Sequence, residues 1–309
     1  MTGVKVVVSG GTGVIGRAAV RAMVDAGHSV DVVTRRPDNV PLVESLGATP
    51  LPGDVFEAAS LAPLFRGADA VVNLATHVPV GYAAALGHSW RRNDRLRTRA
   101  VPSIVAAARE AGVRRVVQES ISFVYADHGD AWITEDSPIE ITSVTEPVAV
   151  AEAAVQDYAC ESRIGVLLRF GLIVGDDDQT RFWLRAAAHG RPVGIGRPET
   201  WTSLLHTDDL GGAVLAALHA PSGVYNVGAE PVRRSEVVEG YAKAAGADSA
   251  GFLGPVLRRF AGPRLEPLTR SLRISSERFS ASTGWRPLRA AFDPAWFDAA
   301  LEPAPPVGS

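Results

Sequence analysis

The sequence predicts an α/β protein with a doubly wound parallel sheet and a smaller C-terminal substrate lobe. Over the first 170 residues, short apolar runs rich in Val and Ile alternate with helical segments. This pattern is typical of a parallel sheet covered by helices on both faces. A glycine-rich turn, SGGTGVIG at residues 9–16, separates the first apolar run from the first helical segment. The 309 residues are enough to bury a large core.

The predicted strands and helices alternate along this first part of the chain. In a doubly wound sheet, ligands bind at the carboxyl ends of the strands, so the residues that follow each strand are the first candidates for a site. We expect strands at residues 4–9, 29–34, 48–51, 69–75, 114–120 and 164–170, and helices at residues 14–26, 40–47, 57–66, 90–111 and 147–162.

The pattern is looser after residue 170. A helix is expected at 180–189, and a strand end that runs into a helix at 204–219, with the helix capped near Thr207–Asp209. A further strand is expected at 223–228, and the Arg-rich segment 250–275, punctuated by Pro and Gly, reads as part of a lid or substrate lobe. The expected domains are a nucleotide-binding domain at 1–175 to which 204–228 returns, a substrate lobe formed by 176–203 and 229–303, and a disordered tail at 304–309.

Composition narrows the class of protein. The net charge is −3 and the pI is near 6.2, so no basic field points to nucleic acid or to an anionic membrane. The single cysteine, Cys160, excludes an intramolecular disulfide and fits a reducing compartment. No apolar run is long enough to span a bilayer, and no His or Cys pattern has the spacing of a metal site. We expect a cytoplasmic protein that acts on a small molecule.

The glycine-rich turn predicts a dinucleotide site. Gly10, Gly13 and Gly16 have the spacing that lets the turn close, the backbone approach a pyrophosphate and the helix pack on the sheet. Val14 and Ile15 open the helix, whose N-terminal N–H groups then face the phosphates.

Together with other motifs, this turn resembles that of the extended short-chain dehydrogenases/reductases of the NAD-dependent epimerase/dehydratase type. The resemblance runs nearly end to end and implies a Rossmann domain that holds a nicotinamide dinucleotide. It implies that Asp54 and Val55 of GDV meet the adenine, and that Leu74, Ala75 and Thr76 of VNLAT lie beneath the nicotinamide. The further matching motifs are AAAREAGVRRVV (106–117), RFGLIVG (169–175), HTDDL (206–210), GVYNVGAEPVRRSEVVE (223–239) and STGWRP (282–287).

The end of the second predicted strand favours NADP(H) over NAD(H). Relatives that prefer NAD carry an acidic residue there for the ribose hydroxyls, whereas this chain has Thr34, Arg35 and Arg36. An arginine matches a 2′-phosphate both in charge and in paired donors. The alternative is that these are two solvated loop arginines in an Arg-rich chain.

The catalytic residues of the resembling family are not found at their usual places. The family uses a Ser or Thr after the fifth strand, and a Tyr followed four residues later by a Lys on the next helix. Here the Ser position falls on Ile121, between Ser120 and Ser122, and the helix EPVAVAEAAVQDY places Glu146 and Val150 at the Tyr and Lys positions. Lys5 and Lys243 are the only lysines, and the other 29 basic side chains are arginines, so no Tyr-x-x-x-Lys occurs in the chain.

Three groups are candidates to replace this pair. Glu119, Ser120, Ser122 and Tyr125 form the first, in which a Ser binds a substrate oxygen and Tyr125 or Glu119 moves a proton; the alternative is a polar strand end without catalysis. Glu146 is the second, as a carboxylate base tuned by burial, although an acid is also common at a helix start. The third is the loop with Asp127, His128 and Asp130, which can equally be a solvated turn; His77 is a lesser candidate.

Hydride transfer needs only the cofactor and correct positioning, so loss of the usual pair is compatible with catalysis. We therefore expect an NADP(H)-binding atypical enzyme of this family that acts on a small organic substrate, as a reductase with a non-standard proton relay. A non-redox isomerase, dehydratase or cyclase on the same scaffold, and a non-catalytic NADP(H) sensor, remain open. The resemblance also implies a homodimer paired through helices 90–111 and 147–162; the alternative is that the apolar face of 147–162 covers the sheet. The arginines at 258, 259, 264, 270 and 273 are candidates to meet an anionic substrate, and the alternative is that they are surface charges.

Overall fold

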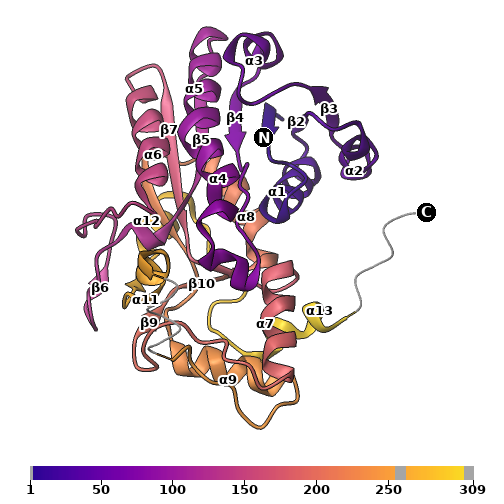
Figure 1. Ribbon diagram of the computed structural model, residues 1–309. Coiled ribbons are helices and arrows are strands. Elements are labelled where there is room, and N and C mark those ends of the chain that lie inside the picture. The colour runs from indigo at the N-terminus through magenta and orange to yellow at the C-terminus, as the bar shows by residue number, and fades with distance from the viewer. Residues whose placement is uncertain (1–2, 255–261, 303–309) are drawn as a thin grey trace.

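A computed structural model describes residues 3–254 and 262–302 of the chain. A layered part built on the main sheet occupies one half of the molecule, and α7, α9 and α13 gather in the other half (Figure 1). The predicted tail 304–309, and Arg258 and Arg259, lie outside the described residues.

A seven-stranded sheet in the order β11-β7-β5-β4-β1-β2-β3 forms the centre of the fold, and every pairing within it is parallel. The predicted doubly wound sheet is confirmed, because the order reverses direction at β1. All seven strands coincide with predicted runs to within about two residues at each end. They are β1 (Lys5–Ser9), β2 (Ser29–Thr34), β3 (Thr49–Pro52), β4 (Ala70–Asn73), β5 (Arg115–Ile121), β7 (Ile164–Phe170) and β11 (Gly223–Val227).

Helices cover both faces of the sheet, as the continuously apolar strands predict. On β1, Val6 and Val8 belong to a core under α1 and α8, whereas Val7 points to the opposite core. Side chains of successive strand residues alternate between the two faces, which explains this division. One face carries α1 (Val14–Asp25), α2 (Val40–Ser45) and α8 (Thr207–Ala217), and the other carries α3 (Ala58–Phe65), α5 (Val101–Glu110) and α6 (Glu146–Tyr158).

The predicted helix 90–111 exists, but it contains an irregular turn. It consists of α4 (Gly87–Arg95), a π-helical turn at Leu96–Ala100 and then α5. π-Helical turns inside α-helices often occur at functional sites. This turn buries the side chain of Arg97, which becomes important below.

The C-terminal lobe has its own apolar core, built from α7 (Asp178–Ala188), α9 (Arg234–Ala244) and the segment around Trp296 and Phe297, which leads into α13 (Asp298–Leu301). Three short strand pairs lie outside the main sheet: β8 (Leu172–Val174) with β10 (Leu204–His206), β9 (Trp201–Thr202) with β12 (Val232–Arg233), and β6 (Trp132–Ile133) with β13 (Arg273–Ile274). The β6–β13 pair links the segment after β5 to the C-terminal lobe.

The cap of α8 lies one residue before its predicted place. His206 is the N-cap, and its Nδ1 accepts a hydrogen bond from the Asp208 N–H at 3.1 Å. Among the described residues, no helix has both the length and the apolar character needed to cross a bilayer.

Candidate cofactor and active site

The glycine-rich turn is packed so tightly that two of its positions accept only glycine. Gly10 has a φ of +77°, and a Cβ there would lie 2.5 Å from the backbone N of Ala75. A Cβ on Gly16 would lie 2.0 Å from the carbonyl oxygen of Gly10. Gly13, the N-cap of α1, is different: it is exposed, and a Cβ there would meet only the Gly10 oxygen, at 3.5 Å. The turn therefore leaves an open approach to the N-terminus of α1, which fits the pyrophosphate of a dinucleotide.

The residues predicted to hold the adenosine lie at the same edge of the sheet. Thr34 is buried at the end of β2 and its hydroxyl donates to the Arg36 carbonyl at 3.3 Å. Arg35 is exposed and its Nη1 lies 3.7 Å from Oδ2 of Asp54, which follows β3. The other oxygen of Asp54 accepts from the N–H of Phe56 at 3.0 Å, which fixes the turn that contains Val55.

The end of β4 connects the glycine turn to β5. Leu74 donates its N–H to the Ser9 carbonyl at 2.9 Å, and the Ala75 N–H points to Oδ1 of Asn73 at 3.3 Å. The Asn73 amide donates to Gln118 of β5 at 2.8 Å. Leu74 is buried, and Ala75 and Thr76 are partly exposed beside the turn.

Next along β5, Glu119 forms a buried ion pair with Arg97 of the π-helical turn. Nη2 of Arg97 lies 3.0 Å from Oε1 of Glu119, and the two residues are 2% and 4% exposed. Within the described residues, Nε and Nη1 of Arg97, Oε2 of Glu119 and the hydroxyl of the nearby Ser122 have no hydrogen-bond partner. Buried polar groups are nearly always satisfied by protein or by ordered water, so these atoms mark a place for a further polar group, a water molecule or a ligand.

Ser120 belongs to a second buried ionic group. Its hydroxyl donates to Oε1 of Glu152, on α6, at 2.5 Å. Arg169 of β7 holds the same carboxylate with two hydrogen bonds, of 2.9 and 2.6 Å. The carboxylate is thus bound bidentately, which is the strongest geometry for such a pair.

The two other predicted catalytic residues occupy places that favour structural contacts. Tyr125 is fully buried, its hydroxyl donates to Oδ1 of Asn226 at 2.7 Å, and burial raises its pKa despite the nearby Arg169. Glu146 is exposed in the first turn of α6. The structure therefore brings Ser120 and Ser122 to the strand edge beside Glu119, whereas the Glu146 side chain is in solvent.

The polar loop after β5 is used for internal contacts. Asp127 accepts the Ser271 N–H at 3.1 Å, and Asp130 accepts the indole N–H of Trp201 at 2.8 Å. His128 donates its backbone N–H to the carbonyl of Ser271 at 3.2 Å. His77 is exposed, and burial together with nearby arginines lowers its pKa.

Comparison with known proteins decides the family. A family model described as NAD(P)H-binding matches residues 10–166, which is just over half of the chain and includes the glycine turn. The chain belongs to this NAD(P)H-binding family. The resemblance noted from the sequence motifs is thereby confirmed at the level of the family and of dinucleotide binding.

Relatives of this NAD(P)H-binding protein are named as reductases and dehydrogenases. A 3-diazoavenalumate denitrifying reductase from Streptomyces sp is 29% identical over 95% of this chain and 98% of its own length. A 2′-dehydrokanamycin reductase from Streptomyces kanamyceticus is 29% identical over 69% of this chain and 58% of its own. A 3 beta-hydroxysteroid dehydrogenase/Delta 5-->4-isomerase from Mycobacterium tuberculosis is 26% identical over 85% and 80%.

Solved structures show the same fold. A human epimerase family protein with NADPH has a TM-score of 0.78 at 23% identity, over 96% of this chain and 99% of that one. The enzyme WbmG from Bordetella bronchiseptica, with NAD, has a TM-score of 0.74 at 19% identity, over 97% and 93%. One neighbour holds NADPH and the other NAD, so the fold is shared by binders of both cofactors.

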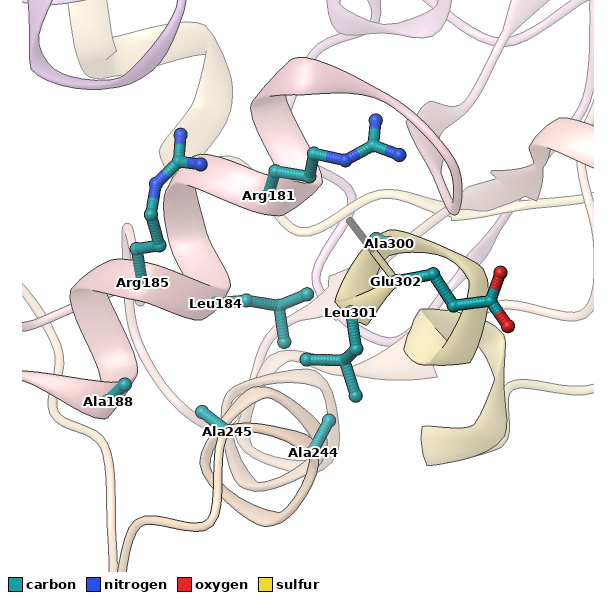
Figure 2. Close-up of a pocket in the computed structure, with 9 residues that line it drawn as sticks. All are labelled: Arg181, Leu184, Arg185, Ala188, Ala244, Ala245, Ala300, Leu301 and Glu302. Atoms are coloured by element: carbon teal, nitrogen blue, oxygen red, sulfur yellow. The ribbon is translucent and has the colours of Figure 1, made fainter. Parts of the chain in front are cut away.

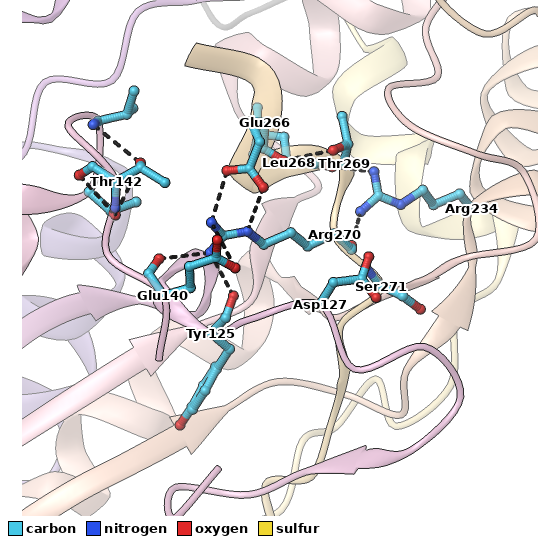
Figure 3. Close-up of polar contacts among 12 residues, drawn as sticks. Tyr125, Asp127, Glu140, Thr142, Arg234, Glu266, Leu268, Thr269, Arg270 and Ser271 are labelled. Carbon is cyan, nitrogen blue, oxygen red and sulfur yellow. Dashed lines mark hydrogen bonds and ion pairs between the residues drawn. The ribbon is translucent and has the colours of Figure 1, made fainter. Parts of the chain in front are cut away.

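Arg270 fixes the loop after β5 to the C-terminal lobe. Its buried guanidinium donates to the carbonyls of Tyr125 and Glu140 at 2.8 and 2.9 Å and pairs with Glu266 at 2.8 Å (Figure 3). Arg234 in turn donates to the Arg270 carbonyl at 2.6 Å. Arg270 is thus occupied by internal partners, which favours a structural role over the substrate contact considered for it.

A hollow of about 400 Å³ lies away from the strand ends, between α7, α9 and α13 (Figure 2). Leu184 and Leu301 point towards each other across it, and Arg181, Arg185 and Glu302 stand at its margin. None of the predicted site residues lines this hollow. In the described part of the chain, no group of three or more potential metal ligands comes together.

Sequence reasoning missed Arg97, Glu152 and Arg169, the charged residues buried around the predicted serines. Arg97 looks ordinary in the run RRNDRLRTR, but it lies between Asn93 and Ala100 on the buried stripe of the helix. A charged residue on such a stripe was the signal that could have identified it.

Proposed function

We propose that this protein is an NADP(H)-dependent reductase that transfers a hydride to a small organic substrate that is already electrophilic when it binds. The observation that carries the proposal is the buried, half-satisfied pair of Arg97 and Glu119 at the carboxyl ends of the central strands. In a doubly wound sheet, this edge is where the reacting groups meet.

The residues of the first turn fit the cofactor. Gly10, Gly13 and Gly16 form the turn that leaves the N-terminus of α1 open to a pyrophosphate. Arg35 and Arg36 support NADP(H), because arginine matches a phosphate in charge and in donor geometry. When bound, the reduced nicotinamide supplies the hydride.

The surroundings of Ser120 support a substrate that needs no acid from the protein. The Ser120 hydroxyl already donates a hydrogen bond to Glu152, and Arg169 binds that carboxylate. The hydroxyl is therefore engaged in an internal hydrogen-bond network. The Tyr125 hydroxyl is buried against Asn226. A carbonyl that must be protonated as it is reduced is poorly served by such groups.

A diazo compound is an electrophile of the required kind, and a diazo substrate is named for the relative that is aligned over nearly its whole length with this chain. An aryl diazonium group accepts hydride at its terminal nitrogen. The resulting aryl diazene loses N₂, and its hydrogen remains on the ring carbon. The balance is one hydride for one N₂, and the protein supplies no proton.

Arg97 and Glu119 then have distinct parts. The free Nε and Nη1 of Arg97 donate to an anionic oxygen of the substrate, such as a phenolate or carboxylate. Glu119 holds the guanidinium in place through Oε1. The Ser122 hydroxyl is available as a further donor or acceptor at the same edge.

Incubation of the full chain with NADPH and 3-diazoavenalumate tests the proposal. We expect stoichiometric NADPH oxidation and N₂ release, and transfer of deuterium from the 4-position of labelled NADPH to the product ring. NADPH that binds without turnover on this or any other electrophile in a panel would instead favour the sensor. Product formed without NADPH oxidation would favour a non-redox reaction.

A matched pair of variants separates the role of the ion pair from folding. Arg97→Met with Glu119→Leu removes both charges together, and we expect it to bind NADPH normally but to lose at least tenfold in turnover. Arg99→Ala, on the exposed side of the same π-helical turn, is the control. If the double variant turns over as fast as the Arg99→Ala control, Arg97 has no part in the reaction.

A further inference from the structure

A pocket of about 450 Å³ lies between α4 and the segments that follow β2 and β3, and is lined by four arginines and one aromatic ring. Arg35 comes from the loop after β2 and Phe56 from the turn after β3, whereas Arg91, Arg92 and Arg95 all belong to α4. None of the described residues that line it is acidic. The pocket therefore concentrates positive charge at one place in a chain whose net charge is −3.

The three arginines of α4 are exposed and have no ion-pair partner among residues 3–254 and 262–302. This distinguishes them from Arg97, Arg169 and Arg270, which are buried and paired. Among the described residues, the only carboxylate that pairs with a lining arginine is that of Asp54, 3.7 Å from Arg35. Several like charges held together without a partner repel one another, and a bound anion relieves that repulsion.

The positions on α4 are suited to a single ligand. Arg91 and Arg95 are one helical turn apart and so share a face of the helix. The guanidinium of Arg95 lies over the ring of Phe56, 4.9 Å from its centre, which keeps the side chain at the pocket wall. Burial lowers the pKa of His77, and the charges of Arg92, on α4, and Arg36, in the loop after β2, lower it further.

The pocket adjoins the adenosine end of the dinucleotide site. Arg35 lies beside Asp54, and Phe56 follows Asp54 and Val55 directly in the chain. The group that distinguishes NADP(H) from NAD(H) at this end is a phosphomonoester dianion on the ribose. Guanidinium groups bind such a dianion with paired hydrogen bonds.

We propose that α4 carries the cofactor specificity of this protein: Arg91, Arg92 and Arg95, together with Arg35, form the receptor for the 2′-phosphate of NADP(H). This rests on the proposed function, since it takes NADP(H) as the cofactor. It goes further by assigning the preference to a helix that follows β4, in addition to the loop after β2. Because four guanidinium groups surround one dianion, NADP(H) binding is strongly dependent on salt concentration.

Titration of the nucleotide-free full chain with NADPH and with NADH, followed by calorimetry, tests the assignment. The variants are Arg91→Ala, Arg92→Ala, Arg95→Ala and the triple variant. Arg99→Ala is the control, because Arg99 is exposed in the π-helical turn that follows α4 but does not line the pocket. We expect each single pocket variant to raise the Kd of NADPH about fivefold or more and the triple variant more than 100-fold. The Kd of NADH should change less than twofold, and Arg99→Ala should behave like the wild type.

Two further arms identify the source of the anion. 2′,5′-ADP should compete with NADPH and should lose affinity in the pocket variants in parallel with it. If the variants weaken binding of inorganic phosphate but leave the Kd of NADPH unchanged, the pocket serves a free phosphate and the assignment is wrong. An unchanged ratio of the NADPH and NADH Kd values in the triple variant also overturns it, and leaves the proposed NADP(H) dependence standing. A wild type that binds NADH more tightly than NADPH overturns both.

Discussion

Arg97 and Glu119 form an ion pair that bridges the π-helical turn before α5 and the end of β5, with Nη2 and Oε1 3.0 Å apart and both side chains almost fully buried. A buried pair of this kind is costly to desolvate, and its attraction repays the cost only when the remaining donors and acceptors are satisfied. Here three of those atoms are not satisfied by the described residues. The pair is therefore better explained by what it binds than by what it adds to stability.

The first prediction concerns the stability of this pair. Arg97→Met or Glu119→Leu alone leaves the other charge buried without its partner, so each should lower the free energy of unfolding by about 3–5 kcal/mol. The double variant removes both charges and should recover most of that loss. Urea denaturation of the four proteins measures the coupling. Losses that simply add in the double variant would show that the two charges do not interact.

The second prediction compares two glycines of the same turn. Gly10→Ala places a Cβ against the Ala75 backbone at a positive φ, and should destabilise the protein by at least about 1–3 kcal/mol. Gly13 has a φ of −78° and open space beside it, so Gly13→Ala should change stability by less than about 1 kcal/mol. It should nevertheless weaken NADPH binding at least tenfold, because the methyl group occupies the approach of the pyrophosphate. Thermal unfolding without nucleotide and calorimetric titration separate the two effects; tight NADPH binding by Gly13→Ala would contradict the prediction.

The fold could be predicted because its signals are local. The apolar run of β1, the glycine turn and the helix after it are adjacent in the sequence, and each excludes most alternatives on its own. The doubly wound class followed from the alternation of apolar strands and helices, whereas the order β11-β7-β5-β4-β1-β2-β3 was not predicted and is seen in the structure. The π-helical turn at Leu96–Ala100 could not be predicted, because the helical pattern of apolar residues runs through it without a break.

The sequence motifs predicted the residues of the cofactor turn, but they did not predict the buried charged residues around Ser120. Placing the family's Tyr and Lys positions at Glu146 and Val150 gives the correct four-residue spacing, yet both side chains point outwards, and Val150 is 39% exposed. Val148 and Glu152 have the same spacing and are both buried. Which face of α6 meets the sheet depends on tertiary packing, so the role of Glu152 could be seen only in the structure.

The third prediction concerns Tyr125 and Glu146, the two candidate proton donors or acceptors that the family resemblance suggested. Tyr125→Phe removes the donor to Asn226 and should cost about 1–3 kcal/mol of stability, because a buried acceptor loses its partner. Turnover of the folded variant should stay within twofold of the wild type. Glu146→Gln, in the exposed first turn of α6, should change stability by less than about 1 kcal/mol and leave turnover unchanged. A tenfold fall in turnover in either variant, with NADPH affinity retained, would return that residue to the reaction.

The last prediction is a pH dependence at the N-cap of α7. Asp177 accepts the N–H groups of Gln179 and Thr180 at 2.8 and 3.0 Å, and burial raises its pKa above the ordinary value of 3.8 despite these hydrogen bonds. The folded protein therefore holds this proton more tightly than the unfolded chain does. Its contribution to the free energy of unfolding rises as the pH falls through the raised pKa, and the gain is complete below about 3.8.

Asp177→Asn isolates this contribution, because an Asn side chain caps a helix as well as Asp does but does not titrate. At neutral pH the variant should be at least as stable as the wild type. As the pH is lowered towards 4, the wild type should gain stability relative to the variant, and urea denaturation at a series of pH values measures the difference. A difference that stays constant would mean that Asp177 has the same pKa in the folded and unfolded chains. A wild type that loses stability relative to the variant on acidification would mean that its hydrogen bonds to the α7 backbone outweigh its burial.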